Sequence, residues 1–360
     1  MQIGRFIVET HCHGQRHAVR IQETGDDSDY KTLPDKMKMA VPAEEAEEDD
    51  EVIVYDNSER VLRDMDAYGV DMCVLLPSFG MTNALNQQII ENHPGTFIAA
   101  AAPVQTKKKA LRGEEDWSWE AAAEEIDHWL QQDGFKMTGE GIRCDPTRRE
   151  PIPWPERKEQ LRYTFDVAAK HEVPVRWHTG YVSGYGGAHG LFNILPDWAD
   201  PTLASQMKAE YPEVPIIFDH GGMQAGWQEK FVDACCQVAG TFDDVYLEIG
   251  LYWADLMKKP FNDPNIGVDQ LLWGTDWGAS MVEHHQPNED PQSYWEQISA
   301  RGLPAHQPDY WGSSLRQLNK FAMDVDLPQD TLNLILGGNA ARLFDLDIPD
   351  HRMFEQYIEV

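Results

Sequence analysis

The sequence predicts an α/β fold, a (β/α)8 TIM barrel, from three observations. Eight short apolar segments recur along the 360 residues, helical patterns separate most of them, and several segments end on histidine, aspartate or glutamate. Short apolar runs bounded by glycine, proline or polar residues are typical of buried parallel strands. A strand–helix unit repeated eight times is the pattern of the closed barrel. A doubly wound open sheet is the alternative, but no G-x-G-x-x-G motif follows the first segment.

The elements follow one another in a regular order. Strands are expected at 5–10 ("RFIVET"), 72–77, 97–104, 134–138, 173–179, 214–220, 245–250 and 270–276. Helices are expected at 58–69, 117–132, 156–172 and 313–325. The fourth strand is ambiguous, because "GFKMT" (134–138) and "GIRCD" (141–145) both fit. We expect one metal-dependent domain over residues 1–360.

Two segments interrupt this order. Residues 22–51 are polar and acidic and follow the first strand, and residues 279–312 are rich in His, Pro, Trp and Gln and follow the eighth. Both leave the barrel at the end of the strands where barrel enzymes carry their active sites. We interpret them as lid or subunit-contact insertions, and a solvated acidic loop is the alternative for 22–51.

Composition narrows the class of protein. The 30 basic and 61 acidic residues give a net charge of −31, which would repel nucleic acid and anionic membranes. The longest apolar stretches, such as 97–104, are too short to span a bilayer. No basic segment precedes an apolar run at the start of the chain. The five cysteines are odd in number and lack zinc-finger spacing, which favours reduced thiols in a cytoplasmic protein.

Five polar residues lie where expected strands end, at the face where barrel enzymes place their chemistry. They are His11, His13, His178, His220 and Asp276. The intervals from His220 to Glu248 and from Glu248 to Asp276 are both 28 residues, close to the length of one barrel unit.

The first two histidines should act together. His11 and His13 are two residues apart, so both side chains point to one side of the strand, and Glu9 should share that face one layer deeper. Neutral imidazoles with a carboxylate suit Zn²⁺, Mn²⁺ or Fe²⁺, with an open position for water or substrate. A buried structural role is the alternative for any one of these histidines taken alone.

Five motifs in combination resemble the amidohydrolase superfamily. They are "ETHCH" (9–13), "RWHTG" (176–180), "FDHGG" (218–222), "WGTDWG" (273–278) and "LILGGNAARLFDL" (334–346). The most similar branch contains aminocarboxymuconate semialdehyde decarboxylase and the resorcylate-type decarboxylases. The resemblance covers residues 5–346 apart from the two insertions. One departure is Glu9, where the family usually has aspartate.

The resemblance implies roles for these residues. His11, His13, His178 and Asp276 would bind a divalent metal ion, His220 would be the acid/base, and Asp276 would orient or deprotonate a bound water. In dinuclear members a carbamylated lysine bridges two ions, and His220 then joins the second ion. Lys136 is the candidate for that lysine, and Glu140 or Glu248 would supply a further oxygen ligand. An ordinary ion pair is the alternative for Lys136, so one or two ions per chain are expected.

Substrate contacts are less clearly marked. His189, in the glycine-rich segment 184–190, and Arg16, which follows the first ligand pair, are candidates to bind a small carboxylated substrate. Arginine suits such a role because it binds carboxylates in a bidentate manner. Structural and surface roles are the alternatives for both. His17 lies beyond the expected strand and is interpreted as a loop histidine.

The resemblance leaves the reaction open. Non-oxidative decarboxylation and hydrolysis of a small carboxylate need the same residues. The alternative is a dinuclear Fe or Fe/Mn, O2-dependent hydroxylase of a small amino or carboxylic acid. A few members of this fold resemble such enzymes, among them a 2-aminoisobutyric acid hydroxylase built from two related subunits, and extra oxygen ligands at Lys136, Glu140 or Glu248 would favour it. A metal-poor subunit that supports an active paralogue is the third possibility. We expect a homo- or hetero-oligomer with a related barrel subunit.

Overall fold

The computed structural model describes the barrel and leaves out most of both insertions. The described residues are 5–14, 16–20, 52–56, 58–77, 81–140, 145–147, 152–179, 200–223, 229–277 and 310–348. The insertion expected at 22–51 lies wholly outside them, and only residues 310–312 of the one at 279–312 lie within.

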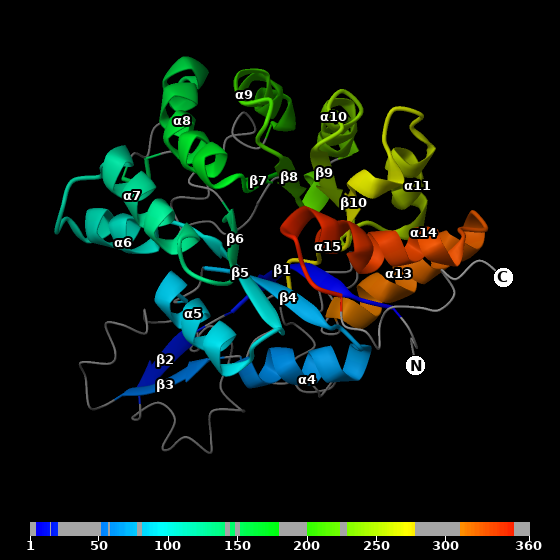
Figure 1. The fold of residues 1–360 in the computed structure, drawn as a ribbon, viewed down its shortest axis with the longest axis horizontal. Coiled ribbons are helices and arrows are strands. Elements are labelled where there is room, and N and C mark those ends of the chain that lie inside the picture. The colour runs from blue at the N-terminus through cyan, green and yellow to red at the C-terminus, as the bar shows by residue number, and fades with distance from the viewer. Residues whose placement is uncertain are drawn as a thin grey trace.

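Eight parallel strands form the centre of the molecule, as predicted (Figure 1). They are β1 (Val8–His13), β4 (Met72–Leu76), β5 (Phe97–Ala101), β6 (Phe135–Thr138), β7 (Val175–His178), β8 (Ile216–Asp219), β9 (Val245–Glu248) and β10 (Leu271–Leu272). Each is hydrogen-bonded to the next in chain order. The residues after β10 pair with β1. Trp277 forms a parallel β-bridge with Cys12, and the Thr10 N–H donates to the Trp273 carbonyl at 3.1 Å. The sheet is therefore a nearly closed (β/α)8 barrel.

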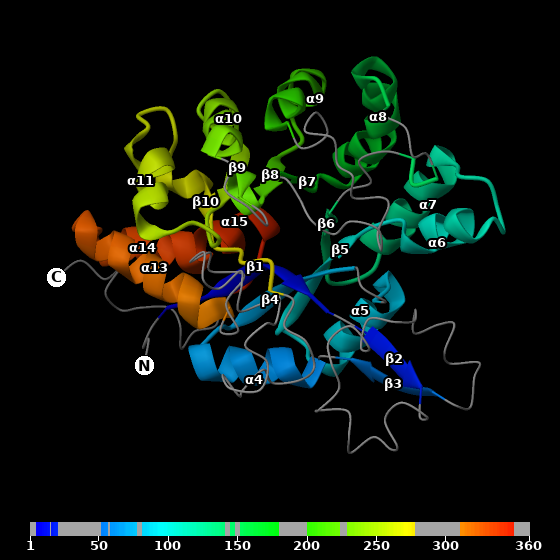
Figure 2. The ribbon, with the colours of Figure 1, turned by 180° about the vertical axis from the view of Figure 1, so that it is seen from behind.

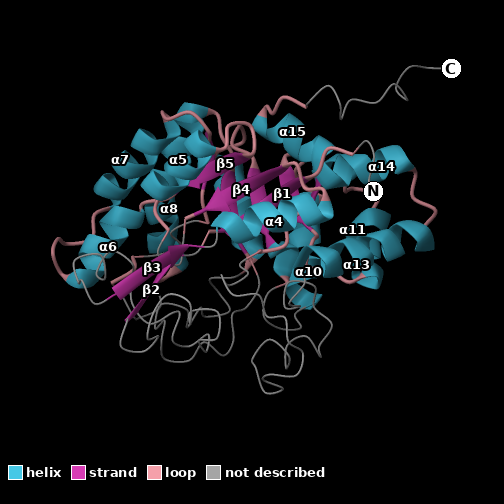
Figure 3. Cartoon of the chain, turned by 90° about the horizontal axis from the view of Figure 1, so that it is seen from below, coloured by secondary structure: helices cyan, strands magenta, loops and turns pink. Residues whose placement is uncertain are grey.

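Helices enclose these strands (Figure 3). The four that the sequence predicts are α4 (Ser58–Tyr68), α7 (Trp119–Leu130), α8 (Trp154–His171) and α13 (Tyr310–Asp324). Those the sequence did not single out are α5 (Asn83–Asn92), α6 (Val104–Arg112), α9 (Ala204–Glu210), α10 (Glu229–Ala239), α11 (Ala254–Asn262), α14 (Gln329–Asn333) and α15 (Asn339–Phe344). Among the described residues, no helix is both long and apolar enough to cross a membrane.

One ribbon was not predicted. Strands β2 (Arg16–Arg20) and β3 (Val52–Asp56) pair in antiparallel fashion on either side of the acidic insertion. Figure 2 shows this ribbon standing away from the barrel strands. His17 therefore lies on a strand and not in a loop. Because the two strands are separated by a long polar segment, neither has a nearby partner that sequence patterning would reveal.

The end of the barrel where the strands begin is apolar. Inward side chains of the strands pack there in one cluster with residues of α15: Phe6, Val8, Met72, Val74, Leu76, Ile98, Ala100, Met137, Ile217, Leu272, Ala340, Ala341 and Phe344. Gly337, just before α15, lies so close to the chain that an added Cβ would stand 2.2 Å from the Phe6 carbonyl oxygen. The "LILGGNAARLFDL" motif thus closes the bottom of the barrel, a position associated with stability and not with catalysis.

Two strands carry a β-bulge that changes which side chains face inward. On β1, Glu9 pairs with Cys73 and Cys12 with Leu75, so three steps on β1 match two on β4. On β6, the pairing passes from Phe135 directly to Met137, which leaves Lys136 as the extra residue. A bulge of this kind breaks the period-two alternation of side chains.

Candidate metal centre

Four buried imidazoles gather where the barrel strands end. His11 and His13 lie at the end of β1, His178 ends β7, and His220 begins the 3₁₀ turn (His220–Gly222) after β8. All are at most 3% exposed. The Nε2 atoms of His11 and His13 are 3.2 Å apart, and the His220 ring lies 4.6 Å from those of His11 and His178 between centroids. The sequence therefore placed these side chains together correctly.

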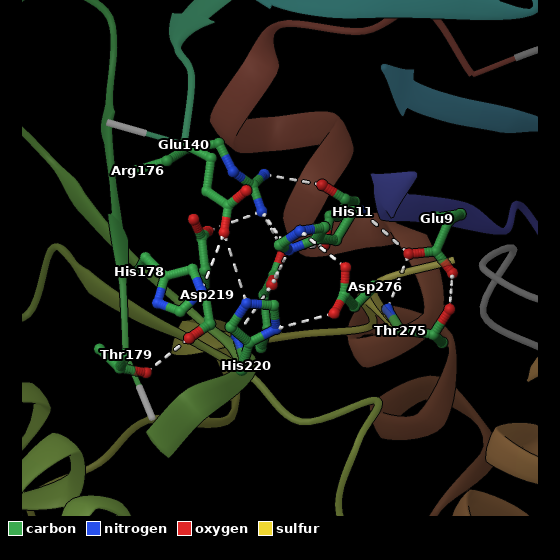
Figure 4. A network of polar contacts seen from close by, with 12 residues as sticks. Glu9, His11, Glu140, Arg176, His178, Thr179, Asp219, His220, Thr275 and Asp276 are labelled. Carbon is green, nitrogen blue, oxygen red and sulfur yellow. Dashed lines mark hydrogen bonds and ion pairs between the residues drawn. The ribbon is translucent and has the colours of Figure 1, made fainter. Parts of the chain in front are cut away.

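Two carboxylates span this group (Figure 4). Asp276 Oδ1 lies 3.1 Å from His13 Nε2 and 3.6 Å from His11 Nε2, and its Oδ2 lies 4.0 Å from His220 Nδ1. Glu140 Oε1 lies 3.2 Å from His178 Nε2 and 3.6 Å from His220 Nε2, while its Oε2 lies 3.6 Å from His13. Both carboxylates are 19% exposed, so the group opens toward solvent on their side.

Strained backbone holds two of these residues. His220 has φ 64° and Asp276 has φ 55°, the left-handed region that side chains with a Cβ seldom adopt. His220 directly follows β8, and Asp276 lies four residues after β10, so both strained residues lie where the chain leaves the barrel strands. Such conformations cost about 1–3 kcal/mol each and cluster at functional sites.

The carboxylates and imidazoles of this group shift one another's pKa values. Burial alone would raise the pKa of Glu140, but the imidazoles of His178, His220 and His13 outweigh it and hold that pKa well below its usual range. Asp276 behaves likewise, with burial opposed by His220 and His13. Burial would lower the pKa of His220, but the two carboxylates raise it. The imidazoles thus hold both carboxylates in the ionised form.

The donor set fits a divalent metal ion. His11, His13 and Asp276 have ligand atoms within 4.8 Å of one another, as do His11, Glu140 and His220. Neither ring nitrogen of buried His220 has a hydrogen-bond partner among the described residues. Two nitrogens bound to one zinc ion at about 2.1 Å in a tetrahedron lie about 3.4 Å apart, which matches the His11–His13 separation. Imidazole and carboxylate donors are those that zinc, manganese and iron prefer.

A second set of charges lies on the far side of His11 and is fully buried. Glu248 Oε2 is 2.8 Å from His11 Nδ1, and its Oε1 is 2.5 Å from Arg176 Nη2. Arg176 Nη2 is also 2.7 Å from Asp219 Oδ1, and Nη1 donates to the Thr10 carbonyl at 2.7 Å. Burial would raise the pKa of Glu248, but Arg176 and His11 outweigh it and lower that pKa.

Glu9 does not share the face of His11, contrary to the expectation from alternation. The bulge on β1 places Glu9 opposite Cys73, in the outer core. Its Oε1 accepts from the backbone N–H groups of His11 and Thr275 at 2.9 and 2.8 Å, and its Oε2 from the Thr275 hydroxyl at 2.8 Å (Figure 4). Burial raises the pKa of Glu9 to about 8. This residue joins β1 to the segment after β10.

The remaining predicted site residues differ in placement. "GFKMT" supplies β6, and Lys136 on it makes no hydrogen bond or ion pair within the described part of the chain. The residue of this region that joins the cluster is Glu140, two residues after β6 ends. Glu248 lies on the Nδ1 side of His11, away from His13 and Asp276. His189 lies outside the described residues, and for Arg16 only the backbone, on β2, is described.

Sequence reasoning missed Arg176 and Asp219. Both belong to expected strands: Arg176 lies two residues before His178, and Asp219 directly precedes His220. The available signal was the charge itself, since an ionised side chain within a buried strand is almost never found without a partner. Their partners, however, lie on other strands and leave no trace in local pattern.

Comparisons with known proteins agree with this architecture. The model of a family described as amidohydrolase matches residues 42–346. No curated protein matches the sequence. A probable 2-pyrone-4,6-dicarboxylic acid hydrolase from Acinetobacter baumannii, solved with citric acid bound, is similar at 12% identity with a TM-score of 0.52, over 94% of this chain and 99% of that one. An amidohydrolase from Burkholderia multivorans is similar at 11% identity with a TM-score of 0.51, over 95% of this chain and 100% of that one.

Proposed function

Because the chain belongs to the amidohydrolase family, we propose that it is a metal-dependent enzyme that decarboxylates, without oxidation, or hydrolyses a small carboxylated substrate. The observation that carries this proposal is the convergence of His11, His13 and Asp276 beside His220, whose ring nitrogens make no hydrogen bond within the described part of the chain. His11, His13, His178 and Asp276 would hold the ion. A divalent ion there would polarise a carbonyl or carboxylate and lower the pKa of water.

The chain supplies two groups for moving protons. The raised pKa of His220 keeps its ring protonated at higher pH than a free histidine, which suits donation of a proton from Nδ1 or Nε2 to a carbon that loses CO2. The lowered pKa of Asp276 keeps Oδ2 unprotonated, which suits acceptance of a proton from water. Decarboxylation uses the first group and hydrolysis the second, so the same site supports both reactions.

Two considerations support a carboxylate as the substrate: the charge of the ion and the similarity of the fold to one solved structure. With Asp276 as the one carboxylate among its four ligands, a divalent site would retain one positive charge, so a carboxylate substrate would be attracted to it and would bind through an open position of the ion. A structure of the same fold is that of a probable dicarboxylic acid hydrolase. Pyrone dicarboxylates, hydroxybenzoates and citrate are therefore the first compounds to try.

Elemental analysis and product assays test this proposal. Protein purified without added metal should contain about one divalent ion per chain, and chelation should abolish turnover. His220→Gln should retain the ion but lose turnover, because the amide cannot carry the proton. Asp276→Asn should lose both. An Asp276→Asn variant with wild-type metal content and activity would refute the assignment of the site.

A second function is favoured by the position of Glu140, and we propose it as the alternative. This carboxylate reaches toward His178 and His220 with one oxygen and toward His13 with the other, as a ligand shared by two ions would. His220 would then be a ligand and not a proton carrier. A pair of iron ions, or iron with manganese, would support O2-dependent hydroxylation of a small amino or carboxylic acid, with a related barrel subunit as partner.

The number of ions and the use of O2 separate these functions. Two ions per chain including iron, with O2 consumed in proportion to product, would favour the hydroxylase. Glu140→Gln should then lower the metal content from two to one. One zinc or manganese ion per chain, CO2 release without O2 uptake, and an unchanged metal content in Glu140→Gln would favour the first function. Native mass measured alongside tests the expected oligomer.

A further inference from the structure

A layer of buried charge lies beneath the candidate metal ligands, and neither proposed function uses it. Arg176, Asp219 and Glu248 are at most 1% exposed and form two ion pairs through one guanidinium. Barrel interiors are usually filled by branched apolar side chains. Taking an ion out of water costs several kcal/mol even in a relaxed protein. A layer of this kind at the barrel centre therefore lowers stability unless its contacts compensate. One of those contacts joins Glu248 to His11.

Glu248 is held from four directions. Its Oε1 accepts from the Thr10 hydroxyl at 2.9 Å and from Arg176 at 2.5 Å. Its Oε2 is 2.8 Å from His11 Nδ1 and accepts from the His220 backbone N–H at 3.2 Å. Each oxygen has two partners, so the carboxylate has neither freedom to rotate nor a lone pair left for an ion. Arg176 Nη2 also lies 3.0 Å from His11 Nδ1, but its two hydrogens have nearer acceptors in Glu248 Oε1 at 2.5 Å and Asp219 Oδ1 at 2.7 Å. Glu248 Oε2 is therefore placed to accept a hydrogen bond from Nδ1–H of His11.

We propose that Glu248 and Arg176 are positioning residues for His11. Glu248 accepts a hydrogen bond from Nδ1–H of the neutral imidazole. The lone pair of the ring is then on Nε2, the atom that faces His13 and Asp276. Arg176 fixes Glu248 through the contact of Nη2 with Oε1. The inference rests on the proposed function, because Nε2 has a use there only if a divalent ion binds. A carboxylate behind a ligand histidine fixes its tautomer and orientation and raises its basicity.

The residue at 274 supports this assignment independently. A Cβ added to Gly274 would stand 2.6 Å from Glu248 Oε1 and 2.5 Å from Thr10 Oγ1. Real Cβ atoms do not approach other atoms so closely, so a side chain there would displace the carboxylate or the hydroxyl. Gly274 thus leaves the space that the Glu248 carboxylate occupies against β1.

The affinity of the metal-free protein for Co²⁺ tests the proposal directly, with no need for a substrate. Glu248→Gln should weaken Co²⁺ binding by about 10- to 100-fold, the range typical of partners that support a ligand histidine. Its Co²⁺ absorption spectrum should also change, because the geometry at Nε2 changes. Thermal denaturation of the metal-free variant gives the temperature below which it is folded, and the titrations are made there.

Glu125→Gln is the matched control. Glu125 is a carboxylate remote from the cluster that accepts hydrogen bonds from the backbone N–H groups of Gln105 and Thr106. Its loss should lower thermal stability while the Co²⁺ affinity stays within about twofold of wild type and the spectrum is unchanged. A merely structural role for Glu248 would give the same result, and that outcome would overturn the proposal.

Further outcomes separate this inference from the proposed function. Wild-type protein that binds no Co²⁺ would overturn both. Wild-type binding with equal affinity in Glu248→Gln would overturn the inference alone. If Glu248→Gln does not fold, Gly274→Ala carries the test, since it keeps every charge and moves the carboxylate. Its Co²⁺ affinity should fall by about 3- to 10-fold, and an unchanged affinity would overturn the inference.

Discussion

The two ends of the barrel interior differ in polarity, one being apolar and the other charged. Where the strands begin, the inward side chains are apolar and α15 covers them. Where the strands end, the interior holds imidazoles and carboxylates over a layer of buried ion pairs. Arg176 and Ile217 mark where the two kinds of interior meet, because they are register partners on neighbouring strands, one in the ion pairs and the other in the apolar cluster.

The difference teaches how one fold supports both stability and chemistry. Burying apolar surface stabilises the folded state by about 25 cal/mol per Å², whereas buried charges contribute little net stability but fix geometry. We therefore expect changes at the polar end to alter cation binding, with a loss of stability as well where a buried charge loses its partner, and changes at the apolar end to alter stability alone. The following variants test that division, from the largest expected effect to the smallest.

His13→Ala should produce the largest effect, on binding. The Nε2 of His13 lies among His11, Asp276 and Glu140. Truncating the side chain therefore removes one nitrogen ligand from the group that would bind the cation. Divalent cation affinity should fall by more than about 100-fold, beyond the loss for a supporting partner. Titration of the metal-free protein measures it, with exposed His128→Ala as the control that binds normally.

Arg176→Met should produce the largest loss of stability. It leaves Asp219 and Glu248 buried together without a cation. Removing one partner of a buried pair costs about 3–5 kcal/mol. Urea denaturation of metal-free protein gives the free energy of unfolding, and a loss below 1 kcal/mol would mean that these charges are not held as an ion-paired layer.

Ile217→Ala, beside Arg176, should affect stability alone. Ile217 is fully buried in the apolar cluster, and truncating such a side chain costs about 2–5 kcal/mol. The cation affinity of the folded variant should match that of wild type. A tenfold change in affinity would show that the two ends of the barrel are coupled and would break the comparison.

Asn339→Ala should cost less, again at the apolar end. The Asn339 amide donates to the carbonyl oxygens of Val268 and Leu271 at 2.9 and 2.8 Å. Leaving buried acceptors without a donor costs about 1–3 kcal/mol. Thermal denaturation measures the loss, and impaired cation binding with normal stability would assign the "LILGGNAARLFDL" motif to the site after all.

Glu9→Gln should have the smallest effect, below about 1 kcal/mol. The amide oxygen of glutamine can accept from the His11 and Thr275 backbone N–H groups, and its NH2 can donate to the Thr275 hydroxyl. Glu9→Ala removes these acceptors and should cost about 1–3 kcal/mol. Equal losses in both variants would show that the ionised carboxylate itself is needed.

Spacing in the sequence determined the barrel and the five residues expected at its strand ends. Apolar runs predicted all eight barrel strands, and His11, His13, His178, His220 and Asp276 were placed together because parallel strands end at one face. Such inferences succeed because strand direction and period are properties of the local chain. The β2–β3 ribbon escaped them because its strands pair across a long insertion.

Only the tertiary structure decided which side chains stand beside these residues. A bulge on β1 turned Glu9 toward Thr275. Of the candidates Lys136, Glu140 and Glu248, it is Glu140 that lies among His178, His220 and His13. Arg176 met Glu248 across 72 residues of sequence. Bulges, and pairing between distant charges, depend on how strands align in space. Local pattern therefore predicts where functional residues end up, but not which neighbours fix their orientation and charge.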